Sequence, residues 1–196
     1  MRWTIALAIA AVGLTSCTAA SHKRYSDISD VAESPGEYMM HVAGRAGEAT
    51  QADRNFVYRA TVQCLYDVDL ARVAEERASS TAIKDFARSV TNQCRAQDRQ
   101  LTLVAEQHVG VTPPATLDRT HAAMRDQVAA LSGQAFDKAY VQDQIAASGR
   151  AVHLFLQQSR SGSEPVLQDF AEAALPQLQQ RQRAAQALGD QFSTKS

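Results

Sequence analysis

The fold is decided by residues 81–110, which read TAIKDFARSVTNQCRAQDRQLTLVAEQHVG. Apolar side chains recur through this stretch at steps of three and four, the spacing that places residues on one face of an α-helix. Ser80 just before it and Gly110 at its end are typical of the residues that start and end helices. The stretch therefore predicts one long amphipathic helix, whose apolar face consists of Ile83, Ala87, Val90, Cys94, Leu101 and Val104.

The same periodicity predicts further helices on both sides. One covers about residues 52–78, and a short one covers about 115–131. Another begins after Ser132 and ends near residue 161, and a last helix is capped by Ser163 and contains Pro176, which predicts a kink. Four long amphipathic helices joined by short breaks, with one short extra helix, predict an all-α bundle. The apolar face of the first helix consists of Phe56, Ala60, Cys64, Val68 and Ala71.

The composition agrees with one folded domain of ordinary size. The chain has 196 residues, 45% of them apolar, and its 20 basic and 21 acidic side chains give a net charge of -1. This apolar fraction excludes a wholly disordered chain. The near-neutral charge lacks the basic excess of a dedicated nucleic-acid-binding protein, so no nucleic-acid partner is expected.

The amino terminus has the features of an export signal. An uncharged run from Trp3 to Leu14 is too short to cross about 30 Å of hydrocarbon as a helix. It ends in Leu14-Thr15-Ser16-Cys17, which resembles the lipobox of bacterial lipoproteins. The resemblance implies that residues 1–16 are removed as a signal peptide and that acyl chains such as palmitate are attached at Cys17. The alternative is an ordinary signal cleaved near Ala19 or Ala20, in which Cys17 has no role.

Lipidation at Cys17 predicts where the protein resides. Several acyl chains anchor a protein stably to a membrane, and in lipoproteins Thr18 in place of aspartate indicates the outer membrane. We therefore expect an envelope protein on the periplasmic face of the outer membrane, whose partners are the membrane and an unidentified envelope protein. The polar residues 17–50 predict a flexible tether, followed by a bundle domain at 51–191 and a polar tail at 192–196. After the signal, no apolar run reaches the about 18 residues of a membrane-spanning helix.

Short motifs along the domain indicate a family. The most specific are Leu131-Ser132-Gly133 with Ala135-Phe136-Asp137, and Leu175-Pro176. Further motifs are Phe56-Val57, Asp67-Val68-Asp69-Leu70, Ala78-Ser79-Ser80, Phe86-Ala87, Leu117-Asp118, His121, Ala139-Tyr140, Ala151-Val152 and Leu154-Phe155. Together they resemble a bacterial envelope family known as domain of unknown function 4142, over roughly residues 52–190. The resemblance implies a ferritin-like four-helix bundle with one extra short helix.

The resemblance also implies a metal site that this chain has lost. Members of the family usually carry histidines on three helices, and the flanking motifs align those histidines with Cys94, Ser148 and Arg181. Acidic positions on the first helix are kept as Asp67 and Asp69. Inward histidines and carboxylates hold transition metals in bundle cores. Because all three imidazoles are missing, we expect poor metal binding and no cofactor.

A weaker alternative is a rearranged metal site. Asp118 and His121 have the spacing of two neighbouring ligands on one helix face, and Asp67, Asp69 or Cys94 would complete such a site. Helix capping and surface solvation explain Asp118 and His121 equally well.

Signatures of catalysis are missing from the sequence. It contains no Gly-x-Ser-x-Gly elbow, no phosphate-binding glycine loop and no Cys-x-x-Cys pair, so we do not expect an enzyme. Arg181 and Arg183 stand among glutamines on the last helix, and this polar run predicts a solvated surface.

Cys64 and Cys94 form a candidate disulfide. Ser79, at the predicted turn, stands midway between them in the sequence, so both cysteines reach the same height in an antiparallel helix hairpin. Both lie on apolar stripes, and an exported protein meets an oxidising compartment. The alternative is two buried, reduced cysteines that act as small apolar residues.

These observations favour a non-enzymatic, lipid-anchored periplasmic bundle of structural or interaction type. The competing hypothesis is a ferritin-like metal-binding or oxidative-stress protein with a rearranged site. An unrecognised hydrolase has no motif in its support.

Overall fold

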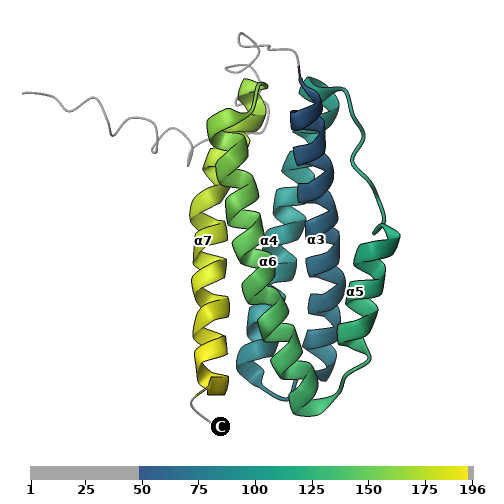
Figure 1. The fold of residues 1–196 in the computed structure, drawn as a ribbon, viewed down its shortest axis with the longest axis vertical. Helices are drawn as coiled ribbons and strands as arrows, with labels where there is room; N and C mark the ends of the chain where they lie inside the picture. The colour runs from purple at the N-terminus through teal and green to yellow at the C-terminus, as the bar shows by residue number, and fades with distance from the viewer. Residues whose placement is uncertain (1–48, 194–196) are drawn as a thin grey trace, which may run out of the picture. The chain divides into compact units, whose positions relative to one another are not determined.

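The structure is built from helices. The computed structural model describes residues 49–193, and every regular element in that range is helical. This confirms the predicted all-α bundle of four long helices with one short extra helix (Figure 1). The signal peptide, Cys17 and the tether up to residue 48 lie outside the described residues. The elements are α3 (Gln51–Arg77), α4 (Thr81–Val104), η1 (Ala105–Val109), α5 (Arg119–Ala129), α6 (Gly133–Ser161) and α7 (Pro165–Ser193).

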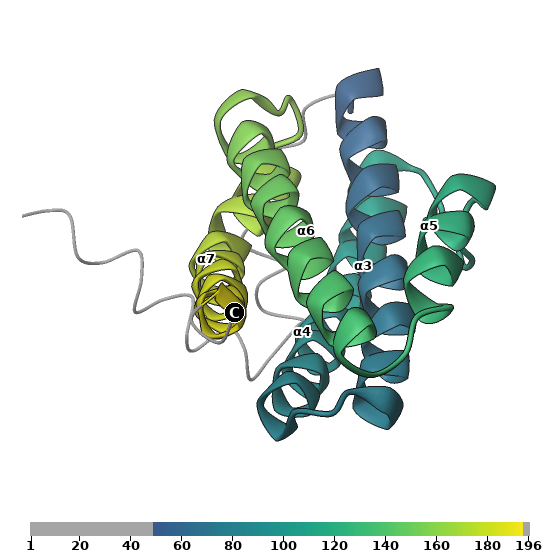
Figure 2. The same cartoon turned by 60° about the horizontal axis from the view of Figure 1, so that its bottom comes forward.

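Two helix hairpins form the bundle. α3 packs against α4 across the turn at 78–80, and α6 packs against α7 across the turn at 162–164. The chain passes from one hairpin to the other through η1 and α5, and α5 lies along the outer side of α3 (Figures 1 and 2). One long crossover between two hairpins is the connection of ferritin-like bundles. The four long helices therefore enclose one interior.

A capping box fixes the start of α3. The Thr50 hydroxyl oxygen accepts a hydrogen bond from the Asp53 backbone N–H, and the Asp53 carboxylate accepts one from the Thr50 backbone N–H at 2.8 Å. The same buried carboxylate accepts from Gln158 Nε2 at 2.7 Å and from the Ser163 backbone N–H at 3.1 Å. Burial acts to raise the pKa of Asp53, but these hydrogen bonds outweigh it and hold the pKa below its usual value. Asp53 thus ties α3 to the α6–α7 turn.

Asp137 performs the corresponding role at the other end of the bundle. Its carboxylate accepts from the Ser79 backbone N–H at 3.2 Å and also from the Ser79 hydroxyl. Ser80 occupies the N-cap position of α4, but its side chain makes no capping hydrogen bond. The buried Asp137 therefore fixes the turn before α4, where Ser80 was expected to cap the helix. The motif Ala135-Phe136-Asp137 at the start of α6 thus has a structural role.

The connection between the hairpins begins as predicted and then departs from the prediction. η1 is a π-helical continuation of α4, and Gly110 follows it with φ +68°, a left-handed conformation that glycine adopts without strain. This confirms the expected helix end near Gly110. α5 begins at Arg119, later than the predicted residue 115, because Asp118 is its N-cap and accepts from the His121 backbone N–H at 2.9 Å.

α7 differs from the prediction at both ends. Glu164, not Ser163, caps it: Glu164 Oε1 accepts from the Val166 backbone N–H at 3.3 Å, whereas the Ser163 backbone N–H donates to Asp53. The helix contains Pro176 in its interior, where the kink stays a prediction, and it reaches Ser193, beyond the predicted domain end at residue 191.

The bundle interior contains two aromatic clusters. Phe56, Phe155 and Phe170 pack together in one, with 5.0 Å between the ring centroids of Phe56 and Phe155. Phe136 stacks on Tyr140 at 6.0 Å in the other. Within residues 49–193, no helix has both the length and the apolar character needed to cross a membrane. Along α6 the residues between the two clusters include buried polar side chains, and the candidate site lies there.

Candidate functional site

One polar residue from each long helix meets its counterparts inside the bundle. These residues are Asp67 on α3, Cys94 on α4, Gln144 on α6 and Arg181 on α7, and all four are buried. We call them the polar core. Two of them carry charge, and a charge in such a position is costly unless it is paired and hydrogen-bonded.

An ion pair forms the centre of the polar core. Arg181 Nη1 lies 3.2 Å from Asp67 Oδ2, and the same nitrogen donates to Cys94 Sγ at 3.2 Å. Asp67 Oδ1 accepts from Gln63 Nε2 at 2.9 Å and from Gln144 Nε2 at 3.4 Å. Burial acts to lower the pKa of Arg181, but the negative charge of Asp67 outweighs it and raises the pKa above its ordinary value. The guanidinium is therefore a permanent cation inside the bundle.

The position of Arg181 shows that the prediction of a solvated surface was wrong for this residue. Its side chain is 4% exposed, whereas Arg183 on the same helix is exposed as expected. Arg181 lies at helical spacing in a buried stripe with Leu178, Ala185 and Leu188. That spacing is the sequence signal that Arg181 is buried. The prediction of a solvated surface relied instead on the polar composition of the surrounding residues.

The structure places different chemistry at the positions where the resemblance implies histidines. Cys94 and Arg181 belong to the polar core, and Ser148 is buried one turn along α6 from Gln144, to whose backbone carbonyl its hydroxyl donates at 2.6 Å. A guanidinium offers no lone pair to a metal and adds positive charge beside it. Within residues 49–193, no group of three or more His, Cys, Asp or Glu side chains is arranged to hold a metal ion. These residues do not fit the metal that the resemblance implies.

Within the part of the chain that the structure describes, the residues of the weaker metal alternative do not form one group of ligands. Asp67 is in the polar core, and Asp69 Oδ2 pairs with Arg125 Nη1 at 3.0 Å. Asp118 and His121 come together, with 2.8 Å between Asp118 Oδ2 and His121 Nδ1, and Cys94 Sγ lies 3.9 Å from Asp67 Oδ2 in the polar core. Hydrogen bonds from the His121 backbone and ring lower the pKa of Asp118 to about 2. Asp118 therefore acts as a helix cap.

Cys64 lies on α3, and Cys94 lies on the neighbouring helix α4. Both are buried free thiols in this structure, and Gln97 Nε2 donates to Cys64 Sγ at 3.3 Å. A hydrogen bond with Cys94, together with burial, raises the pKa of the Cys64 thiol well above its usual value. Cys94 is therefore near enough to Cys64 to influence the pKa of its thiol. Their oxidation to a disulfide stays a prediction.

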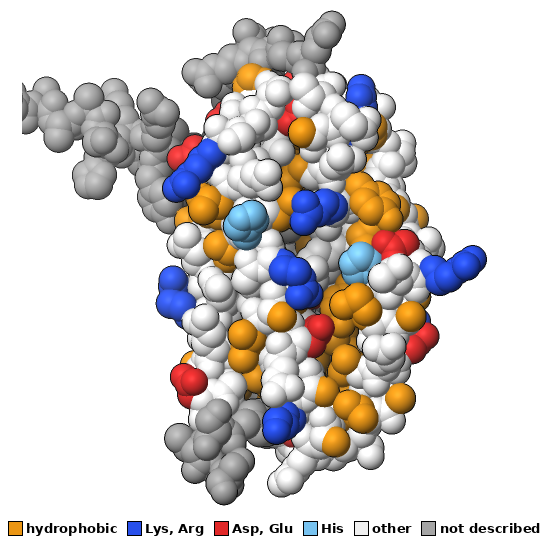
Figure 3. All heavy atoms as spheres, viewed as in Figure 1, with side chains coloured by type: hydrophobic (Ala, Val, Ile, Leu, Met, Phe, Trp, Pro, Cys, Tyr) orange, Lys and Arg blue, Asp and Glu red, His pale blue; other side chains and the backbone are white. Residues whose placement is uncertain are grey.

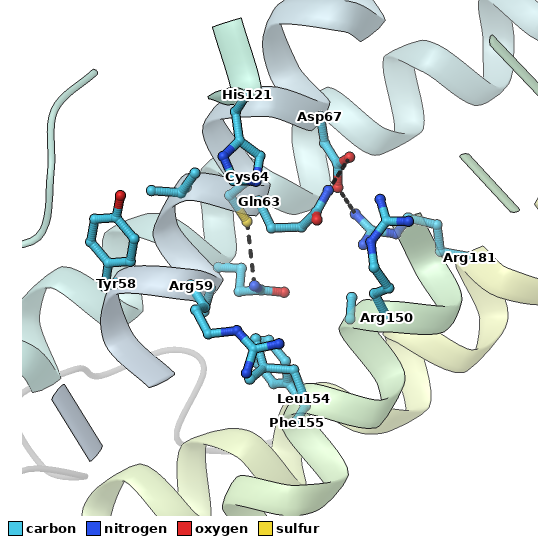
Figure 4. A pocket seen from close by; sticks show the side chains of 14 residues that line it. Tyr58, Arg59, Gln63, Cys64, Asp67, His121, Arg150, Leu154, Phe155 and Arg181 are labelled. Atoms are coloured by element: carbon cyan, nitrogen blue, oxygen red, sulfur yellow. Dashed lines mark hydrogen bonds and ion pairs between the residues drawn. The ribbon is translucent and has the colours of Figure 1, made fainter. Parts of the chain in front are cut away.

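A cavity of about 150 Å³ opens beside the polar core (Figure 4). Among its lining residues, Cys64, Asp67 and Arg181 are buried, whereas Arg59 and Arg150 are exposed. Figure 3 shows basic side chains near the middle of the face that displays α3, α5, α6 and α7. This cavity could not be predicted, because its residues come from helices far apart in the chain and no short motif links them.

The fold and the site define a class of protein: a ferritin-like four-helix bundle whose interior is organised by an ion pair. The chain matches the family model described as "Domain of unknown function (DUF4142)" over residues 39–188. It therefore belongs to this family, as its motifs predicted. The match begins ahead of residue 52, so part of the predicted tether falls within the family model. No curated protein matches the chain.

Two solved structures have a similar fold. A DUF305 fragment from Deinococcus radiodurans superposes with a TM-score of 0.63 at 19% identity, covering 73% of this chain and 99% of that one. CopM in the Cu(II)-bound form superposes with a TM-score of 0.60 at 16% identity, covering 70% of this chain and 95% of its own. At these identities the likeness shows a shared helical-bundle fold and nothing about ligands.

Proposed function

We propose that this protein is a lipid-anchored periplasmic bundle that acts by structure or interaction, without catalysis. The observation that carries the proposal is the Arg181–Asp67 pair in the polar core. The interior position where the resemblance implies histidines is filled by groups that neutralise one another and hydrogen-bond to neighbours from all four long helices. Such an arrangement favours one fixed packing of the helices over reactivity.

The anchor is supported by the sequence at the amino terminus. Leu14-Thr15-Ser16-Cys17 resembles a lipobox, and Thr18 follows the cysteine. Acyl chains at Cys17 would hold the bundle at the membrane surface on a polar tether. Attachment at the periplasmic face of the outer membrane follows from the same resemblance.

Metabolic labelling tests the anchor. Cells that express the full chain are fed an alkyne analogue of palmitate, and the protein is purified and probed for the label. We expect label on the wild-type protein in the outer-membrane fraction, and neither label nor membrane association for Cys17→Ser. An unlabelled wild-type protein that begins near Ala19 or Ala20 would instead establish an ordinary secretory signal.

Metal analysis tests the alternative of a rearranged metal site. Protein purified without chelator is measured for iron, manganese, zinc and copper by mass spectrometry of the elements. We expect far less than one ion per chain, because the guanidinium of Arg181 occupies the interior of the bundle. A stoichiometric ion would favour the metal-binding hypothesis over the structural one.

A further inference from the structure

The cavity beside the polar core carries an excess of positive charge. Three arginines from three helices line it: Arg59 on α3, Arg150 on α6 and Arg181 on α7. The acidic side chain in the lining is Asp67, which is already paired with Arg181. The charge of the other two arginines is therefore not neutralised by the cavity wall, and a small enclosed space with one sign of charge concentrates ions of the other sign.

The arginines also have hydrogen-bonding capacity left over. Among the described residues, Arg59 and Arg150 make no hydrogen bond or ion pair, although Asp143 acts electrostatically on Arg150. Arg181 is buried, and its Nε has no hydrogen-bond partner. A buried donor without an acceptor is unfavourable by about 1–3 kcal/mol. An acceptor inside the cavity would give the two rim arginines a partner and place a negative charge beside the guanidinium of Arg181.

The size of the cavity limits what it holds. A volume of about 150 Å³ is equivalent to roughly five water molecules at their share of liquid volume. Arg59 and Arg150, which are exposed, lie at the cavity, and Figure 4 shows both side chains there. Planar guanidinium groups match carboxylate and phosphate oxygens with paired hydrogen bonds. A small solute with such a group fits both the space and the donors.

We propose that this cavity is a binding site for a small oxyanion, carried as a carboxylate or phosphate group. Arg181 lies at the floor, held in place by Asp67, and Arg59 and Arg150 close on the ligand from the rim. The proposal goes beyond the structural function above and does not depend on the lipid anchor. It requires neither a metal nor a reaction.

Titration of the chain from residue 17, carrying Cys17→Ser to remove the lipid, tests the site. Inorganic phosphate and succinate are added at constant ionic strength, and binding is followed by calorimetry and by amide NMR shifts. Glycerol is the uncharged control. We expect saturable binding of at least one anion, with shifts centred on Gln63, Gln97 and Arg150, and none with glycerol.

Arginine variants separate a built site from general charge attraction. Arg59→Gln and Arg150→Gln each remove one guanidinium group, and each is expected to weaken anion binding about tenfold or more. The matched controls are Arg54→Gln on α3 and Arg160→Gln on α6, which are exposed arginines outside the cavity. The proposal is overturned if neither anion binds saturably at millimolar concentrations, or if the control variants weaken binding as much as the rim variants. Because all four positions are exposed, we expect the variants to fold.

Discussion

Replacing Arg181 with methionine tests whether the ion pair holds the four helices together. Methionine keeps a long flexible side chain but removes the charge, so the fully buried Asp67 loses its cation. Removing one partner of a buried pair costs about 3–5 kcal/mol, because the remaining charge stays in a poorly solvated position. Since a domain is stable by about 5–15 kcal/mol in total, the variant should lose a large part of its stability.

A double variant separates the charge effect from lost packing. In Arg181→Met with Asp67→Asn no charge remains in the polar core, and we expect the loss to shrink to about 1–2 kcal/mol. The two substitutions should therefore be strongly non-additive, as residues in direct contact are. Arg183→Met is the matched control, because it removes an exposed arginine from the same helix and should change stability by no more than about 0.5 kcal/mol.

Urea unfolding followed by circular dichroism measures all of these proteins at pH 7. In thermal unfolding, Arg181→Met should lower Tm by roughly 6–20 °C, given about 2–4 °C per kcal/mol for a domain of this size. The reasoning is refuted if Arg181→Met is no less stable than Arg183→Met. It is also refuted if the losses of the single variants simply add in the double variant.

Three further perturbations test other parts of the structure. Alkylation without reductant, followed by mass spectrometry, should show Cys64 and Cys94 joined in protein from the periplasm, because both are buried on neighbouring helices and Cys94 is near enough to influence the pKa of Cys64. Two alkylated thiols would contradict this. Asp53→Asn should lower stability at pH 7 by about 1–3 kcal/mol. Because the folded pKa of Asp53 is depressed, its contribution is present above the unfolded pKa of about 3.9 and is lost as pH falls through the folded pKa. The unfolding free energy of the variant should therefore fall less steeply below about pH 4 than that of the wild type, and parallel curves would count against this role. Histidine at Cys94, Ser148 and Arg181 together restores the pattern implied by the family, and we expect calorimetry to detect one Zn²⁺ per chain in this variant and not in the wild type; equal binding would show that these positions do not decide metal affinity.

The helices could be predicted because their signals are local. Apolar spacing along residues 81–110 and the glycine at Gly110 depend on neighbours within a few turns, and both agree with the structure. The predictions were wrong where a group from a distant part of the chain hydrogen-bonds to the backbone near a helix terminus. The Ser80 side chain does not cap α4. Instead, the Asp137 carboxylate on α6 accepts a hydrogen bond from the backbone of the turn before α4.

The polar core could be predicted only in part. The flanking family motifs singled out Cys94, Ser148 and Arg181. However, an arginine is almost never fully buried unless it is paired, so the burial of Arg181 could not be predicted without knowing its partner. Its partner, Asp67, is on the first helix of the bundle, so no local pattern reveals the pair. The cavity depends on side chains from several helices at once, and it becomes visible only when the helices are packed.

The ion pair also sets an order of events in the life of the molecule. Asp67 lies on the first helix of the bundle and Arg181 on the last, so the cation reaches the interior only when the carboxyl-terminal helix is made and docks. Until then the carboxylate of Asp67 keeps the unfinished core open to water, because burying it alone is unfavourable. A chain truncated before α7 would therefore leave Asp67 without its counter-charge. A complete chain carries its own counter-charge in a fixed one-to-one ratio, and neither metal starvation nor a chelator can remove it.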